Sequence, residues 1–225
     1  MIDVEKTKQR LKSHLTTLTI EIGERSVRFL PNLSKAASHI ENFYHEIGLS
    51  VERETYSFRG QEVANVISYA GETISFTRNY IVGAHYDSVA GTVGADDNAS
   101  AVAVQLETAR ELSNLFSKKP SKTRVKFVSF ALEEPPAFGT RHMGSKVHAR
   151  ACKKAREKLD GMLCLEMVGY TCFEPGCQKY PFPLMFMDYP KIGNYVGIVG
   201  NLRSKPLTES IYEAFSKTPI FRWLN

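Results

Sequence analysis

The stretch from Tyr80 to Ala101 constrains the fold and chemistry of this chain more than any other part of the sequence. An apolar run leads into a His-x-Asp pair, His85 and Asp87, and a glycine-containing loop follows. A second acidic pair, Asp96 and Asp97, then stands where a helical pattern begins. Parallel sheets build their sites from strand, polar loop and helix in this order, so the stretch predicts a metal-binding edge of such a sheet.

The chain has 225 residues, of which 43% are hydrophobic and 24% charged. This is enough for one domain with a substantial core and short for two, so we expect a single domain over residues 1–225. The net charge of +5 is modest, and the basic residues are spread along the chain. We therefore expect no nucleic-acid partner and interpret the densest basic patch as a solvated loop; its members are Lys118, Lys119, Lys122, Arg124 and Lys126.

Targeting signals and cysteine pairs are not evident in the sequence. No apolar run approaches the roughly 18 residues that span a membrane, and the charged N-terminal segment lacks the apolar core of a signal peptide. We therefore expect a cytoplasmic protein without a membrane partner. Cys172 and Cys177 flank a Pro-Gly turn and would bridge only in an oxidising compartment, so we expect them to be reduced.

Helical and strand patterns alternate along most of the chain. Apolar residues at helical spacing predict helices within 4–30, 33–47, 98–116 and 143–157 and a last short helix near 207–215. Short β-type runs predict strands at 50–58, 63–69, 79–84, 124–132 and 161–168. In the helix within 143–157 we expect Val147, Ala151 and Ala155 to face inward. The alternation indicates an α/β fold with parallel strands.

Side chains suited to metal binding fall near the ends of the predicted strands. Glu166 lies inside an apolar run, and a buried carboxylate is costly to ionise unless it is paired or bound to a metal. Zinc binds His nitrogen and carboxylate oxygen, so the candidate ligands are His85, Asp97, Glu134 and Glu166. Asp87 stands two residues beyond His85, where it can accept the second N–H of the imidazole and orient the ring.

The adjacent pair Glu133 and Glu134 allows a division of roles. One carboxylate can bind a metal while the other takes a proton from water that the metal activates. The alternative interpretation of Glu133-Glu134-Pro135-Pro136 is a strand terminus followed by a rigid solvent turn. Taken alone, the motif favours neither interpretation.

Four motifs of this chain resemble, in order, those of the zinc aminopeptidases of metallopeptidase family twenty-eight. They are Gly83–Ser88, Gly94–Ser100, Phe130–Pro136 and Leu165–Tyr170. Weaker similarity occurs at Ile22–Arg25, Met143–Ser145 and Gly197–Asn201, so the resemblance covers most of the chain. Glutaminyl cyclases share the fold of this family. The resemblance implies a three-layer α/β/α sandwich with a mixed, largely parallel central sheet.

The resemblance also implies a role for each site residue. His85 and Glu166 would hold one zinc ion, Glu134 would hold a second, and Asp97 would bridge the two. Asp87 would orient His85, and Glu133 would be the general base. The peptide bond after Asp97 would be cis, and the substrate would be a peptide with a free N-terminus.

The chain departs from the family pattern near its C-terminus. The second metal of the family needs a further histidine there, and this sequence has none after His148. His142 and His148 are the nearest substitutes, but we expect both to have surface or packing roles. The sequence thus resembles a member without its C-terminal part, and we expect it to retain one zinc ion and to self-associate through an uncovered sheet edge.

Three functional hypotheses follow. The first is an aminopeptidase-type hydrolase with a co-catalytic zinc site, and the second is an impaired family member that binds at most one zinc ion. The third is a single-zinc acyltransferase similar to glutaminyl cyclases. The third is less favoured, because His85 and Asp87 together belong to the two-metal pattern.

Overall fold

The computed structural model describes residues 2–179 and 190–217. The chain divides into two compact units, Met1–Gly169 and Tyr170–Asn225, and each is described by itself. The expectation of a single domain over residues 1–225 stays a prediction. The first unit contains the sheet and every candidate site residue.

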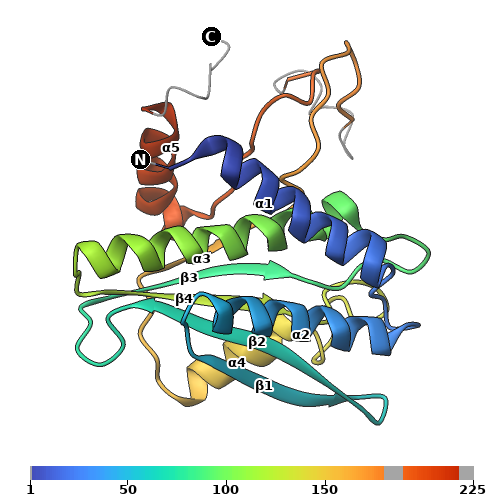
Figure 1. Cartoon of the computed structure of the whole chain (residues 1–225), viewed down its shortest axis with the longest axis horizontal. Helices are drawn as coiled ribbons and strands as arrows, with labels where there is room; N and C mark the ends of the chain where they lie inside the picture. The colour runs from blue at the N-terminus through green and yellow to red at the C-terminus, as the bar shows by residue number, and fades with distance from the viewer. Residues whose placement is uncertain (1, 180–189, 218–225) are drawn as a thin grey trace. The chain divides into compact units, whose positions relative to one another are not determined.

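The sheet of the first unit has five strands in the order β1-β2-β4-β3-β5 (Figure 1). Their bounds are β1 Val51–Phe58, β2 Gln61–Gly71, β3 Arg78–His85, β4 Thr123–Phe130 and β5 Gly161–Cys164. β2 is antiparallel to both β1 and β4, whereas β3 runs parallel to both β4 and β5. The mixed sheet that we predicted is therefore confirmed, and its site-bearing strands β4, β3 and β5 form the parallel part.

Local sequence explains the antiparallel part of the sheet. β1 and β2 are joined by the two residues Arg59 and Gly60, which both adopt positive φ angles of 51° and 77°. A two-residue loop of this kind matches the twist of the strands that it connects and forms a tight hairpin. This hairpin joins the strands predicted at 50–58 and 63–69.

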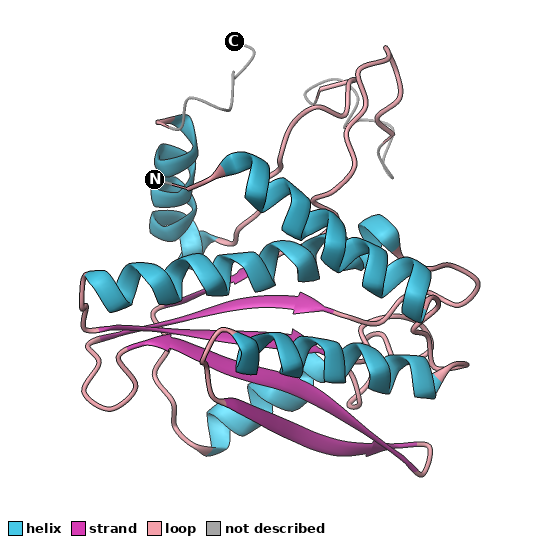
Figure 2. Cartoon of the chain, viewed as in Figure 1, coloured by secondary structure: helices cyan, strands magenta, loops and turns pink. Residues whose placement is uncertain are grey.

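Helices cover both faces of the sheet, which confirms the three-layer arrangement (Figure 2). Helix α1 (Val4–Thr16) continues into a π-helical segment, Thr17–Ile22, and is followed in chain order by α2 (Leu30–Glu46), α3 (Ala101–Lys118) and α4 (Gly144–Lys154). In Figure 1, α2 lies in front of the sheet and α4 behind it.

The side chains of β4 alternate between these two layers. Val125 and Phe127 belong to the large core cluster that contains buried residues of α2 and α3, whereas Val128 and Phe130 belong to a separate cluster. On the side of the large cluster, Val102 and Leu106 of α3 are both 0% exposed, and Leu112 of the same helix is partly buried.

Helix α4 presents a different face to the sheet from the one that we predicted. Its buried residues are Gly144, His148 and Cys152, whereas Ala151 and Ala155 are exposed. His148 lies 3.2 Å from Glu54 of β1 and 3.4 Å from the sulfur of Cys152. The prediction was wrong because polar partners across the interface draw a histidine inward, which an apolar pattern does not reveal.

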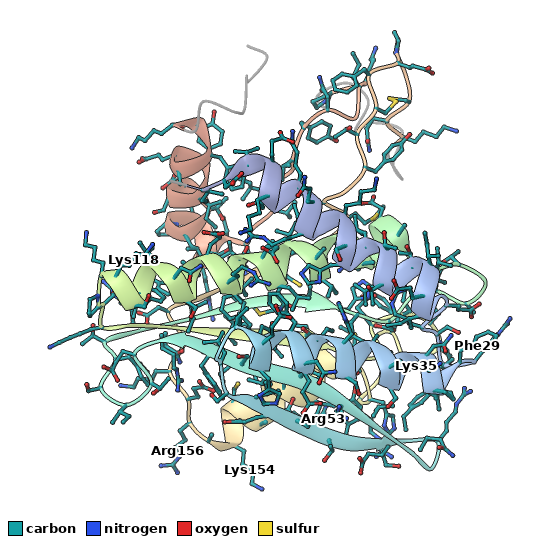
Figure 3. All side chains as sticks on the ribbon, in the orientation of Figure 1. Phe29, Lys35, Arg53, Lys118, Lys154 and Arg156 are labelled. Carbon is teal, nitrogen blue, oxygen red and sulfur yellow. A yellow bond between two sulfur atoms is a disulfide. The ribbon has the colours of Figure 1, made fainter. Side chains whose placement is uncertain are left out.

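The basic patch of the sequence is divided in the structure. Lys118 projects outward at the end of α3 (Figure 3). Arg124 and Lys126 instead point to Glu157, at 2.5 and 2.6 Å, and Lys126 is only 4% exposed. An ion pair to a shared carboxylate therefore removes these two side chains from the surface patch.

The second unit contains a disulfide bond and a helix. Cys172 and Cys177 are bonded, with their Cα atoms 6.4 Å apart, so the expectation that they are reduced was wrong. The turn between them brings the two residues within the distance that a disulfide requires. A 3-10 turn, Leu202–Ser204, leads into α5 (Lys205–Ser216), which confirms the predicted last helix.

The described part of the chain has no helix with the length and apolar character needed to cross a membrane. β5 forms one edge of the sheet, and Met162 on this strand is 41% exposed. The self-association expected through this edge stays a prediction.

Candidate metal centre

The predicted site residues follow the ends of three parallel strands. His85 is the last residue of β3, Glu133 and Glu134 follow β4, and Glu166 follows β5. Asp97 lies in the turn that leads into α3. Because the carboxyl ends of parallel strands meet at one edge of a sheet, this topology brings residues from distant parts of the sequence together.

His85 lies at the centre of the group. Its Nε2 atom is 3.1 Å from Asp97 Oδ1, 3.4 Å from Glu166 Oε1 and 3.8 Å from Glu133 Oε2. His85, Asp97 and Glu166 each offer a ligand atom within 4.8 Å of the others, and so do His85, Glu133 and Glu134. The geometry groups Glu134 with His85 and Glu133, so a bridging role of Asp97 toward Glu134 stays a prediction.

Glu166 occupies a different environment from the one that we predicted. β5 ends at Cys164, so Glu166 lies beyond the strand, and its side chain is 49% exposed. The apolar run around it misled the prediction because β5 is a short edge strand whose residues are only half covered. The carboxylate nevertheless points to His85, as a metal ligand requires.

The unpaired atoms of this group fit a metal ion. His85 is 3% exposed, and neither of its ring nitrogens makes a hydrogen bond of normal geometry with any described residue. The same is true of Asp97 Oδ1. Buried polar atoms are nearly always satisfied in folded proteins. One imidazole nitrogen and two carboxylate oxygens are ligands that zinc prefers, so the residues present fit a zinc ion.

The electrostatics of the group also favour a cation. Burial by itself lowers the pKa of His85, but the contacts with Asp87, Asp97 and Glu166 outweigh it and raise this pKa to about 12. A proton on the imidazole therefore balances the surrounding carboxylates when no other positive charge is present. A metal ion needs the neutral imidazole and would take the place of this proton.

The adjacent glutamates have raised pKa values. Burial is the main cause of the raised pKa of Glu133, and the carboxylates of Asp87, Glu166 and Asp97 add to it against the opposing effect of His85. Burial, followed by repulsion from Asp97, raises the pKa of Glu134 to about 7. Carboxylates with raised pKa values are suited to accept a proton near neutral pH.

Asp87 connects the loops that follow β3 and β4. It is 1% exposed, and its Oδ1 atom lies 3.3 Å from His85 Nδ1. Its two oxygens also accept the backbone N–H groups of Glu133, at 3.0 Å, and of Glu134, at 2.9 Å. The contact with His85 agrees with the predicted role of Asp87 in orienting the imidazole ring. The hydrogen bonds to the Glu133-Glu134 backbone give Asp87 a second role, which is to fix this turn.

Asn98 links the Asp97 turn to the segment that carries Glu166, and we did not predict this from the sequence. Its amide nitrogen donates to Glu166 Oε2 and to Leu165 O, both at 3.1 Å, and its oxygen accepts from Met167 N at 3.1 Å. The Asp97-Asn98 peptide bond is cis, as the resemblance implied. In the sequence, only the position of Asn98 directly after the predicted ligand Asp97 could have indicated this linking role.

Two further residues of the same turn hold the segment after β5. Ser100 Oγ accepts from Val168 N at 3.1 Å, and Asp96 Oδ1 accepts from Gly169 N at 2.8 Å. A Cβ atom at Gly169 would lie 2.6 Å from the Cβ of Ser100, so the close contact requires glycine. Together these bonds fix the chain on the C-terminal side of Glu166.

Asn65 on β2 fixes the start of the Glu133-Glu134 turn. Its side chain accepts from Ala131 N at 3.0 Å and donates to Gly144 O at 2.9 Å. Ala131 O in turn accepts from Gly144 N at 2.8 Å and from the hydroxyl of Tyr56 at 3.2 Å. These contacts hold the backbone just before the two glutamates.

The two histidines considered as substitute ligands lie in other environments. His148 contacts Glu54 and Cys152 on the interface of α4, and His142 packs edge-on against Phe58 with ring centroids 5.7 Å apart. Neither joins the group around His85. The expected packing roles are therefore confirmed.

The three-layer fold and a histidine surrounded by carboxylates at the carboxyl edge of the sheet are typical of a metal-dependent hydrolase. The sequence model of Peptidase family M28 matches residues 65–181, which include every candidate ligand. The chain belongs to this peptidase family.

Named relatives agree with this assignment. Over 203 residues, the chain is 36% identical to the uncharacterized protein YfbL of Escherichia coli (strain K12), covering 87% of this chain and 60% of YfbL. Aminopeptidase YwaD of Bacillus subtilis (strain 168) is 34% identical over 99 residues, covering 44% of this chain and 20% of YwaD. The chain thus spans less than two thirds of the length of these two curated relatives.

Solved structures share the fold. The LapA aminopeptidase of Legionella pneumophila superposes with a TM-score of 0.59 at 21% identity, covering 76% of this chain and 48% of LapA. The glutaminyl cyclase of Fimbriiglobus ruber superposes with a TM-score of 0.56, also at 21% identity, covering 74% of this chain and 62% of the cyclase. At this identity the likeness concerns the fold alone.

Proposed function

We propose that this chain carries the catalytic site of a zinc-dependent aminopeptidase, which removes N-terminal residues from peptides. The observation that carries the proposal is the contact of His85 Nε2 with Asp97 and Glu166, at 3.1 and 3.4 Å, with the carboxylate of Glu133 at 3.8 Å. Membership of Peptidase family M28 and the name of the relative YwaD support the reaction class.

His85, Asp97 and Glu166 hold the zinc ion in this proposal. A bound zinc ion supplies Lewis-acid polarisation of the scissile carbonyl and activates water as a nucleophile. Glu133 accepts the proton that the attacking water loses and passes it to the leaving amine, a role that its raised pKa suits. Asp87 would hold the ring of His85 and the backbone of Glu133 in place. Glu134 would be a ligand of a second ion, which Asp97 would bridge to the first.

A second candidate function is a single-zinc acyltransferase of the glutaminyl cyclase type. Two observations favour it: several solved structures with this fold are glutaminyl cyclases, and one three-residue ligand group is complete without a second ion. The His85-Asp87 pair still favours the aminopeptidase. A third outcome is a protein that binds one zinc ion at most and has no turnover.

Metal analysis and two activity assays separate these outcomes. The protein is loaded with zinc, its metal content is measured, and it is tested on leucine p-nitroanilide and on a peptide with N-terminal glutamine. Zinc-dependent release of nitroaniline, lost on chelation and in Glu133→Gln, supports the aminopeptidase. Release that survives chelation or Glu133→Gln overturns it. Cyclisation of the glutamine peptide supports the acyltransferase, and zinc binding without either activity supports the third outcome.

A further inference from the structure

Arg25 is a buried cation without a partner of opposite charge in direct contact. Its side chain is 0% exposed, and the hydrogen bonds described for its guanidinium all go to backbone carbonyls, while Asp87 acts on its charge without an ion pair. Burial lowers its pKa to about 10, which still leaves the guanidinium charged at neutral pH. A buried charge is costly unless hydrogen bonds compensate for its lost hydration.

The compensation comes from five backbone carbonyls. Arg25 Nε donates to Tyr86 O at 2.8 Å, and Nη2 donates to Gly94 O at 3.1 Å. Nη1 is shared by three further acceptors, Leu18 O, Gly23 O and Val93 O, at 2.8 to 3.0 Å. The side chain thus ties the N-terminal segment to both ends of the loop 86–94.

This loop connects two proposed zinc ligands. Tyr86 directly follows His85, and Gly94 precedes Asp97 by three residues. The middle of the loop is also held, because Ser88 Oγ accepts from the backbone N–H of Arg25 and donates to Thr92 O, both at 3.1 Å.

The loop is also closely packed at Gly94. Gly94 has a φ angle of 53°, and a Cβ atom there would lie 2.3 Å from Asp97 O and 2.6 Å from the Cβ of Ser88. Gly94 therefore packs too closely against Asp97 and Ser88 to carry a side chain. By binding backbone carbonyls at both ends of this loop, Arg25 determines the positions of His85 and Asp97 relative to each other.

We propose that Arg25 is a positioning residue of the metal centre: by gathering the carbonyls of loop 86–94 around one guanidinium, it fixes the separation of His85 and Asp97 before a metal binds. The inference rests on the proposed zinc site. Ligands that are held in place before binding lose less conformational freedom on binding, so their affinity for the metal is higher. Lysine cannot replace arginine here, because a single ammonium group cannot reach carbonyls spread over a planar fork.

The test compares variants of the loop with a matched arginine outside it. Arg25→Lys keeps the positive charge but removes the planar guanidinium that reaches several carbonyls. Ser88→Ala removes the hydrogen bonds of Ser88 Oγ with Arg25 N and Thr92 O at the middle of the loop. Arg110→Lys is the control, because Arg110 on α3 is largely buried, with 22% of its side chain exposed, and pairs with Glu107, which lies outside the metal centre. For each protein the zinc Kd and the Tm without metal are measured.

We expect Arg25→Lys to weaken zinc binding about 10- to 100-fold, the range found when residues behind metal ligands are changed. Ser88→Ala weakens it in the same direction by a smaller factor, and Arg110→Lys lowers Tm without changing Kd. An unchanged Kd in Arg25→Lys overturns the proposal, as does an equal loss in Arg110→Lys. If Arg25→Lys does not fold, an unchanged Kd in Ser88→Ala overturns it.

Hydrogen exchange separates this inference from the proposed function. In the protein without metal, Ser88→Ala and Arg25→Lys should speed amide exchange in residues 86–94 at least several-fold and leave β2 unchanged. If the wild-type chain does not bind zinc but the variants still exchange faster in residues 86–94, Arg25 orders the loop and the proposed zinc function is wrong. Unchanged exchange in 86–94 overturns the positioning role even when the wild-type chain binds zinc.

Discussion

Asp87 reaches from the end of β3 to the turn after β4, where its Oδ2 atom accepts the backbone N–H of Glu134 at 2.9 Å. The same carboxylate lies 3.3 Å from His85 through its other oxygen. One side chain therefore fixes the relative position of a metal ligand and of the two glutamates. The contacts of this carboxylate make its removal the most informative single change.

Asp87→Asn should reduce zinc affinity about 10- to 100-fold and lower the free energy of unfolding by about 1–3 kcal/mol. The amide has one acceptor oxygen in place of two, so one backbone N–H of the Glu133-Glu134 turn loses its partner. Calorimetric zinc titration and urea unfolding measure the two effects. Asp160→Asn is the matched control, because Asp160 also accepts a backbone N–H, that of Asn79 at 2.7 Å, away from the ligands. It should lower stability and leave zinc binding unchanged; equal zinc affinities of Asp87→Asn and wild type would contradict the role of Asp87.

Glu133→Gln and Glu134→Gln should separate proton transfer from metal binding. If the chain turns over leucine p-nitroanilide, the first change should lower kcat by about 10²- to 10⁴-fold, since the amide cannot accept the proton. Its zinc affinity should stay close to that of wild type. Glu134→Gln should weaken metal binding instead, and the two roles are wrongly assigned if the effects are reversed.

The contribution of His39 to the stability of the protein without metal should fall as the pH is lowered from about 6.5 toward 4. Burial, with a smaller effect of His14, lowers the pKa of His39 to about 4, so the folded state holds this ring neutral. The unfolded chain binds a proton below pH 6.5, and each unit of pKa difference corresponds to about 1.4 kcal/mol. This contribution is complete above pH 6.5 and is lost on acidification.

Urea unfolding of His39→Gln between pH 4 and 7 checks this dependence. On acidification over this range, the variant should lose less stability than wild type does. His45→Gln is the control on the same helix, because His45 is exposed, and its curve should follow that of wild type. Parallel curves for His39→Gln and wild type would show that His39 does not carry the effect.

Gly144→Ala should destabilise the first unit by more than about 1 kcal/mol. A Cβ atom at this position would lie 2.2 Å from Ala131 O and 2.4 Å from Asn65 Oδ1, within the contacts that hold the Glu133-Glu134 turn. Thermal unfolding followed by near-UV circular dichroism measures the loss. Gly197→Ala, where a Cβ meets no atom within 4 Å, should leave Tm unchanged; a wild-type Tm for Gly144→Ala would contradict the packing argument.

The sequence alone was sufficient for the elements and for the group around His85. The ends of β3 and β4 could be read from apolar runs, whereas β5 ends before its predicted boundary. A parallel sheet brings such ends together, so Asp97, Glu133, Glu134 and Glu166 were predicted in one place. Their bridging and catalytic roles stay predictions.

Other features could not be read from the sequence for physical reasons. Asn98 and Arg25 act through hydrogen bonds to backbone atoms of loops whose path is set by tertiary contacts. The exposure of Glu166 depends on β5 being an edge strand, and the buried face of α4 depends on the pairing of His148 with Glu54. Residue type and spacing do not reveal such partners.

The tight hairpin of β1 and β2 has a consequence for the order of folding. Contacts between neighbouring strands joined by a two-residue loop form in microseconds, whereas pairing of parallel strands requires closure of long chain segments and is slow. We therefore expect the hairpin to form early and the short strand β5, which brings Glu166 to His85, to dock last. Zinc would then stabilise a contact that forms only at the end of folding. Metal binding should therefore slow unfolding more than it speeds folding.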